Sequence, residues 1–141
     1  MLKVFVLNAA IIALVVIVHY EFLYHFTTIM PKLRMRHRFR IVLGVLAALT
    51  AHAVEIWVFG VAYFFMDRAQ EWGHLAGNYD DKFLSSVYFS FTAYTTLGLG
   101  DIEPLGDMRF LVGLESLTGF VLITWTASFL YLEMTRYWDN Q

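Results

Sequence analysis

Five consecutive residues near the middle of the chain have a spacing that suits ion chemistry: Thr96, Leu97, Gly98, Leu99 and Gly100. Glycine at alternate positions permits backbone dihedrals that other residues rarely adopt. A strand that alternates between left-handed and right-handed values points successive carbonyl oxygens the same way. A ring of such strands would offer stacked cages of oxygen to a dehydrated cation.

Three acidic residues follow this strand at Asp101, Glu103 and Asp107. Acidic groups at the mouth of a pathway raise the local concentration of cations. We therefore expect these three side chains to form the outer mouth of the pathway.

A short apolar run, Phe83–Tyr94, precedes the strand and is too short to cross a membrane. Asp80 and Asp81 suit the N-cap and first turn of a helix. We expect a short helix, the pore helix, over residues 81–95, whose negative C-terminal end points at the strand that follows. A helix that enters the membrane and returns as extended backbone is a re-entrant loop, which must be sheltered by protein or line a water-filled cavity.

Long apolar segments on both sides of this loop indicate an integral membrane protein. Of the 141 residues, 59% are hydrophobic and 18% aromatic, against about 45–50% apolar residues in an ordinary soluble domain. The segments Ile41–Met66 and Phe110–Leu132 are long enough to cross roughly 30 Å of hydrocarbon as helices. With the apolar Val4–Val18, they predict an all-α membrane protein of three transmembrane helices and a re-entrant pore helix.

Several classes of function are disfavoured by the composition. A net charge of −2 gives no basic field for nucleic acid, and the absence of cysteine removes disulfides and thiolate sites. No nucleophile elbow, phosphate loop or paired-carboxylate arrangement is visible, so no enzyme activity is predicted. The five histidines show no metal-ligand spacing, and core or surface roles are expected for them.

The basic segment 31–40, "PKLRMRHRFR", sets the expected topology. It holds five of the ten Lys and Arg residues, and the positive-inside rule places it in the cytoplasm. The N-terminus is then outside and the C-terminus cytoplasmic. Residues 1–30 are expected to remain as an additional transmembrane helix, because no small-residue cleavage site of a signal peptide follows their apolar stretch. The run Lys32–Arg40 could also attract anionic lipid headgroups.

Ionisable residues within the apolar segments raise a separate functional question, because charge inside a bilayer is costly. On the second segment Gly44, Ala48, His52 and Glu55 share one helix face, and Glu115 lies on the third segment. Two alternatives are open. These buried polar groups hydrogen-bond to neighbouring helices or the pore helix, or they sense protons.

The stretch "SVYFSFTAYTTLGLGDIEPLGDMRFLVGLESLTGFVLITWTASFLY" resembles the pore domain of the potassium-channel superfamily. The resemblance covers about residues 83–132 closely. It implies a pore domain over 41–135, with residues 41–66 as the outer helix, 96–101 as the filter and 108–135 as the inner helix. It implies a homotetramer in the cell membrane, with no resident cofactor. The permeant monovalent cation would bind the carbonyls of Thr96, Leu97, Gly98 and Leu99.

The resemblance also implies roles along the inner helix. Gly119 falls where the family often has a hinge, and the inward positions at i, i+4 and i+8 are Ile123, Ala127 and Tyr131. These three are the expected cavity and gate residues. The first helix lies outside the two-helix pattern of the family.

Two leucines depart from the family's usual filter. Leu97 replaces a valine or isoleucine and Leu99 replaces a tyrosine or phenylalanine. Neither change removes a backbone ligand, but both alter the packing that holds the filter's diameter. Potassium is the expected ion, with a non-selective monovalent cation channel as the alternative. A non-conducting membrane scaffold or sensor that retains the pore fold is a further alternative.

Overall fold

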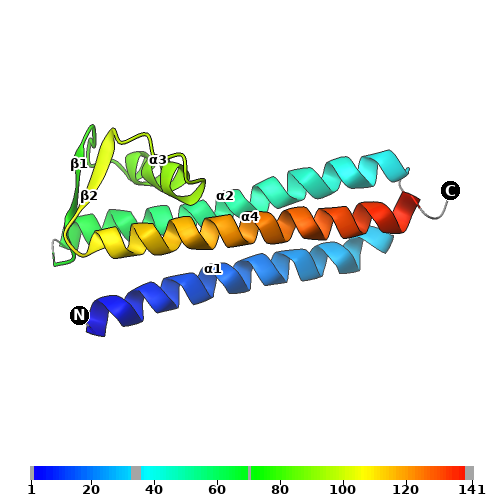
Figure 1. Ribbon diagram of the computed structural model, residues 1–141, viewed down its shortest axis with the longest axis horizontal. Coiled ribbons are helices and arrows are strands. Elements are labelled where there is room, and N and C mark those ends of the chain that lie inside the picture. Colours follow the sequence, from blue (N-terminus) through cyan, green and yellow to red (C-terminus); the bar gives the residue numbers. More distant parts are fainter. Residues whose placement is uncertain (1, 33–35, 70, 139–141) are drawn as a thin grey trace.

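Three long helices form the body of the molecule in the computed structural model, which describes residues 2–32, 36–69 and 71–138. They are α1 (Leu2–Ile29), α2 (His37–Ala69) and α4 (Met108–Trp138), and they run side by side along the longest axis (Figure 1). Among the described residues, these three helices are long and apolar enough to cross a bilayer. The prediction of a helical membrane protein with three spanning helices is therefore confirmed.

The two ends of the helical bundle differ in what they hold. The N-terminus and the loop between α2 and α4 lie at one end, and the C-terminus lies at the other (Figure 1). A 3-10 turn, η1 (Met30–Lys32), follows α1 at the C-terminal end. The basic segment and the N-terminus are thus at opposite ends, as the predicted topology requires. Residues 33–35 of that segment lie outside the described residues.

The pore helix is present as α3 (Phe83–Tyr94) and packs against α2 and α4. It begins two residues later than the expected start at residue 81, and its N-cap is Lys82, with no side-chain cap. The expectation that Asp80 and Asp81 cap the helix is wrong. Asp81 has a left-handed φ of 57°, and the Asp80 carboxylate instead accepts hydrogen bonds from Lys82 Nζ at 2.5 Å and from Ser85 Oγ.

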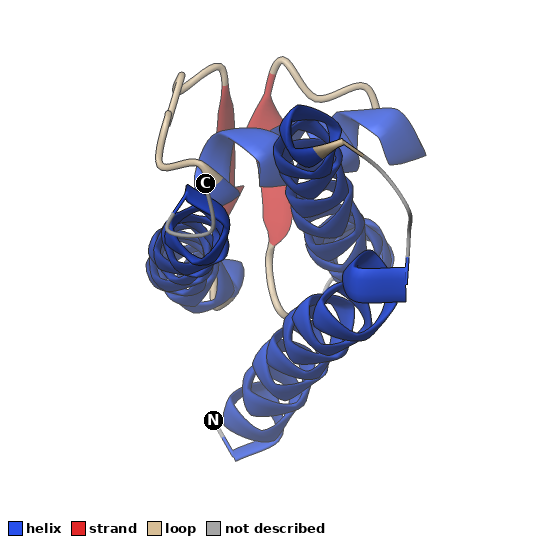
Figure 2. Ribbon diagram, turned by 90° about the vertical axis from the view of Figure 1, so that its right-hand side faces the viewer, coloured by secondary structure: helices blue, strands red, loops and turns tan. Residues whose placement is uncertain are grey.

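A two-stranded antiparallel sheet, which the helical interpretation did not include, closes the re-entrant loop. Strand β1 (His74–Gly77) precedes α3 and pairs with β2 (Ile102–Leu105), with His74 opposite Leu105 and Gly77 opposite Ile102. Viewed along the bundle, the strands and α1 lie on opposite sides of it (Figure 2). The sheet therefore brings the start and the end of the loop together.

The core of the fold lies where α3 meets the two helices behind it. Phe59 and Tyr63 of α2, Tyr94 of α3 and Leu111 of α4 have no exposed surface. A Cβ on Gly60 would lie 2.8 Å from Val87 Cγ2, so α2 and α3 approach closely at this glycine. This packing holds the pore helix at a fixed position against α2 and α4.

Candidate ion pathway and its buried supports

The strand after the pore helix has the alternating backbone that the glycine spacing indicates. Thr96, Gly98 and Gly100 have φ values of 58°, 55° and 75°, and the intervening leucines do not have positive φ. A Cβ on Gly98 or Gly100 would meet no atom within 4 Å. The left-handed dihedral, and not a lack of space, is what requires glycine at these two positions.

Hydrogen bonds fix both ends of this strand. At the pore-helix end, Gly98 N donates to Thr92 O and Thr96 N donates to Ala93 O, each at 3.0 Å. At the other end, Asn78 N donates to Asp101 O at 2.8 Å. The filter segment is therefore held between the C-terminus of α3 and the end of β1.

The two leucine side chains of the filter segment are exposed in the single chain. Leu97 and Leu99 are 63% and 58% exposed, and on α3 the side chains of Leu84, Tyr88 and Phe91 are also exposed. In the described single chain these five side chains stay exposed, and we refer to them together as the apolar face.

The three acidic residues of the expected outer mouth all lie at the loop end of the molecule. Asp101 is partly buried and accepts a hydrogen bond from the Tyr88 hydroxyl at 2.9 Å. Glu103 is exposed on β2, and Asp107 lies directly before α4. Asp101 is thus held by the pore helix, while Glu103 extends into the surroundings.

On the inner helix, Gly119 lies directly against the end of the pore helix. A Cβ at this position would lie 2.2 Å from the carbonyl oxygen of Tyr94. Close packing therefore requires glycine at this position, apart from the hinge role that the family resemblance implies. Ile123, Ala127 and Tyr131 are exposed on one face of α4, and their role in lining a cavity stays a prediction.

Glu115 is fully buried and joins three helices. Its carboxylate accepts hydrogen bonds from the Tyr63 hydroxyl of α2 and the Ser90 hydroxyl of α3, both at 2.5 Å. Ser90 Oγ also lies 2.8 Å from Ile56 O. These contacts correspond to the first of the two alternatives for the buried polar groups, hydrogen bonding between helices.

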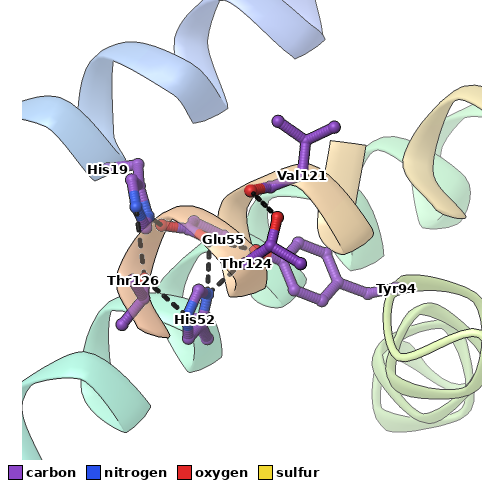
Figure 3. Close-up of polar contacts among 7 residues, drawn as sticks. All are labelled: His19, His52, Glu55, Tyr94, Val121, Thr124 and Thr126. Atoms are coloured by element: carbon purple, nitrogen blue, oxygen red, sulfur yellow. Dashed lines mark hydrogen bonds and ion pairs between the residues drawn. The ribbon is translucent and has the colours of Figure 1, made fainter. Parts of the chain in front are cut away.

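Glu55 is the centre of a second buried polar cluster (Figure 3). Its Oε1 lies 2.7 Å from His19 Nδ1 of α1, and its Oε2 lies 3.0 Å from His52 Nδ1. The Tyr94 hydroxyl donates to the same Oε2. On the other side, Thr126 Oγ1 of α4 lies 3.3 Å from His19 Nε2 and 3.1 Å from His52 Nε2. The cluster joins α1, α2, α3 and α4.

Sequence reasoning identified His52 and Glu55 but missed His19, Tyr94 and Thr126. The available signal was His19 itself, an ionisable residue within an apolar segment. His19, His52 and Glu55 lie close enough to one another to share a metal ion. Their nearest atoms, however, are in hydrogen-bond contact at 2.7 Å and 3.0 Å, so we interpret the cluster as a hydrogen-bond network.

A comparison with protein-family models decides the class of this pore. The model of an ion channel family matches residues 51–136, from the middle of α2 through the pore helix, the filter segment and α4. The chain belongs to this ion channel family. The match supports the potassium-channel-like pore domain that the sequence resemblance indicated. Comparison with curated proteins and with solved structures gave no match.

The matched region of this ion channel excludes α1. That helix nevertheless contacts both α2 and α4, and its His19 is 1% exposed. The channel therefore has an additional helix whose one buried histidine reaches the cluster at the end of the pore helix.

Proposed function

We propose that this ion channel is a homotetramer that passes monovalent cations, potassium in first place, through the carbonyls of Thr96–Gly100. The observation that carries the proposal is the left-handed φ at Thr96, Gly98 and Gly100, directly after the C-terminus of the short helix α3. In such a strand, the carbonyl oxygens replace the hydration shell of the ion. The negative end of the α3 dipole favours a cation at the same place.

Symmetry and the exposed apolar face support the tetramer. One chain supplies one filter strand, and a cage of oxygens needs several strands around an axis. Identical chains most often associate in closed cyclic symmetry. The face formed by Leu84, Tyr88, Phe91, Leu97 and Leu99 is the surface of this chain that a neighbouring subunit would cover. A neighbouring subunit on this face would shield the side chains that flank the ion pathway from lipid and water.

The remaining parts of the pathway follow from position. Asp101, Glu103 and Asp107 concentrate cations at the outer mouth. Ile123, Ala127 and Tyr131 line the inner cavity, and Gly119 allows α4 to bend there. Permeation is passive, down the electrochemical gradient.

The two filter leucines determine the choice between a potassium-selective and a non-selective channel. The backbone ligands are unchanged by leucine, which supports potassium. Leu99, however, cannot hydrogen-bond behind the filter as an aromatic hydroxyl can, and this supports the non-selective alternative. Flux of potassium, sodium and a large organic cation into liposomes containing the purified channel distinguishes the two.

We expect the parent channel to pass potassium faster than sodium and to exclude the organic cation. Leu99→Tyr should increase the ratio of potassium to sodium flux, because the hydroxyl can bond behind the filter. Leu46→Tyr, at an exposed position of α2, is the matched control and should leave the ratio unchanged. An intact tetramer that passes no cation would contradict the channel and favour a scaffold or sensor.

We further propose that the channel lies in the cell membrane with its N-terminus outside and Lys32–Arg40 against anionic headgroups of the cytoplasmic leaflet. The basic segment and the loop end lie at opposite ends of the bundle, which supports this orientation. The chain contains no cysteine, so single cysteines at Asn78 and Arg36 can be tested in intact cells. A membrane-impermeant thiol reagent should label Asn78→Cys and not Arg36→Cys, and the reverse result would contradict the orientation.

A further inference from the structure

The buried cluster around Glu55 forms a closed ring of hydrogen-bond contacts. Four contacts connect its members in a circle, from Glu55 to His19, from His19 to Thr126, from Thr126 to His52, and from His52 back to Glu55. His19, Glu55 and Thr126 are each at most 5% exposed. A buried polar atom without a partner costs free energy, so each of the four contacts requires a hydrogen.

The hydrogens that the ring would hold with neutral histidines can be counted. Each neutral imidazole has one N–H, the Thr126 hydroxyl has one hydrogen, and an ionised carboxylate has none. The Tyr94 hydroxyl has one hydrogen as well, and its contact with Glu55 Oε2 uses it. The same hydroxyl oxygen lies 3.0 Å from His52 Nδ1, where it can only accept. Three hydrogens are then left for four contacts. Both Nδ1 atoms must donate to the Glu55 carboxylate, and Thr126 can donate to one Nε2 alone.

One further proton completes the ring. With a second N–H on one histidine, that ring donates to both the carboxylate and Thr126 Oγ1, and the Thr126 hydroxyl donates to the other histidine. The same proton offsets the charge of Glu55, which has no exposed surface and would otherwise be a buried charge without a partner. The hydrogen-bond count and the charge balance therefore each require one added proton.

The proton belongs on an imidazole and not on the carboxylate. Imidazole is the stronger base of the two in water. The Tyr94 hydroxyl in addition donates to Glu55, and His19 Nδ1 and His52 Nδ1 lie within hydrogen-bond distance of the Glu55 oxygens. Donors at these positions stabilise the ionised form of a carboxylate. Among the described residues, Glu115 of α4 is a further titratable group near the ring and interacts electrostatically with Tyr94.

We infer that the ring of His19, Glu55, Thr126 and His52 is a binding site for one proton, which is held as an imidazolium paired with the Glu55 carboxylate. The site lies at a consequential place, because Tyr94 is the last residue of α3 and the filter segment begins two residues later. The bound proton completes the link from α1 to the end of the pore helix. The inference does not depend on ion conduction.

The test is a count of protonated histidine nitrogens by ¹⁵N NMR of the full chain in lipid nanodiscs at pH 8, where an ordinary histidine is neutral. Replacing His25, His37 and His74 with Gln leaves two imidazoles and four ring nitrogens in the spectrum. We expect three of the four to carry a hydrogen. Two of four, which means two neutral rings, or four of four would overturn the inference.

A matched pair of variants makes the test specific to the ring. Glu55→Gln removes the charge and supplies an amide hydrogen to the circle of contacts, so both histidines should become neutral and the count should fall to two of four. Glu115→Gln makes the same substitution at the other buried glutamate and should leave the count at three. A count of three in Glu55→Gln, or of two in Glu115→Gln, would overturn the inference. If Glu55→Gln fails to fold, the count in the parent still decides.

Discussion

The contact between Gly119 and the end of the pore helix provides a quantitative test of how α4 supports the filter. A Cβ at Gly119 would lie 2.2 Å from Tyr94 O and 3.0 Å from Tyr94 C, whereas ordinary contacts begin at 3.4 Å. Because the obstructing atom is backbone, a rotamer change cannot relieve the clash, and α3 or α4 must shift by roughly 1 Å. Overpacking of this kind costs about 1–3 kcal/mol.

Gly113 is a matched control on the same helix, because a Cβ there would meet no atom within 4 Å. Both Gly→Ala substitutions gain about 1 kcal/mol of helix propensity, so the gain cancels when the variants are compared. We expect Gly119→Ala to be less stable than Gly113→Ala by about 2–3 kcal/mol, near the upper end of the overpacking range.

Equilibrium unfolding in mixed micelles measures the difference in the free energy of unfolding between the two variants. Potassium flux in liposomes should fall in Gly119→Ala, since the displaced carbonyl lies at the end of the pore helix, and should be unchanged in Gly113→Ala. Equal stability and equal flux of the two variants would refute the close contact between Gly119 and Tyr94. This result would also refute the inference that α4 supports the end of the pore helix there.

Three further predictions concern the loop and the buried glutamate. Tyr63→Phe removes one of the two donors to Glu115 and should lower the free energy of unfolding by about 1.5–3 kcal/mol; no loss in mixed-micelle unfolding would contradict that hydrogen bond. Gly98→Ala should strongly reduce cation flux and leave the tetramer assembled in native mass spectrometry, because the left-handed φ and not space is the constraint; unchanged flux would be evidence against the alternating strand. Hydrogen bonds from Lys82 and Ser85 lower the pKa of the exposed Asp80 carboxyl to about 2, below the ordinary value of about 3.9. These contacts should therefore be fully formed above about pH 4 and lost as the pH falls through 2; a midpoint near the ordinary value in a carboxyl ¹³C NMR titration would show that they do not form.

The helices and the filter segment could be predicted from the sequence because their signals are local. Apolar length alone indicates the spanning helices, and the alternate positions of Gly98 and Gly100 indicate the left-handed dihedrals. The family resemblance rests on the same residues, and the family match from 51 to 136 confirms it.

The antiparallel sheet could not be predicted because its partners are distant in the chain. Strands β1 and β2 have four residues each and pair across the pore helix, and Gly77 and Pro104 within them disfavour a strand. The predicted start of the pore helix was wrong because Asp81 adopts a left-handed φ. A residue with this dihedral cannot belong to the first turn of a right-handed helix.

The buried ring was partly predictable. The sequence places His52 and Glu55 on one helix face, but the alignment of α1 against α2 decides that His19 meets Glu55. That alignment follows from packing between helices and leaves no periodic signal in the sequence. Thr126 was missed because an isolated threonine in a transmembrane helix usually bonds to its own backbone, as Thr124 does here.

Ion occupancy in the filter tests the central claim most directly. Crystals of the channel grown in potassium and soaked in thallium(I) would show bound ions by anomalous scattering. The account predicts four chains around one axis, with anomalous peaks on that axis surrounded by the carbonyl oxygens of Thr96, Leu97, Gly98 and Leu99. An assembled channel whose Thr96–Gly100 strands face away from the axis, or whose axis holds no ion at their level, would contradict it.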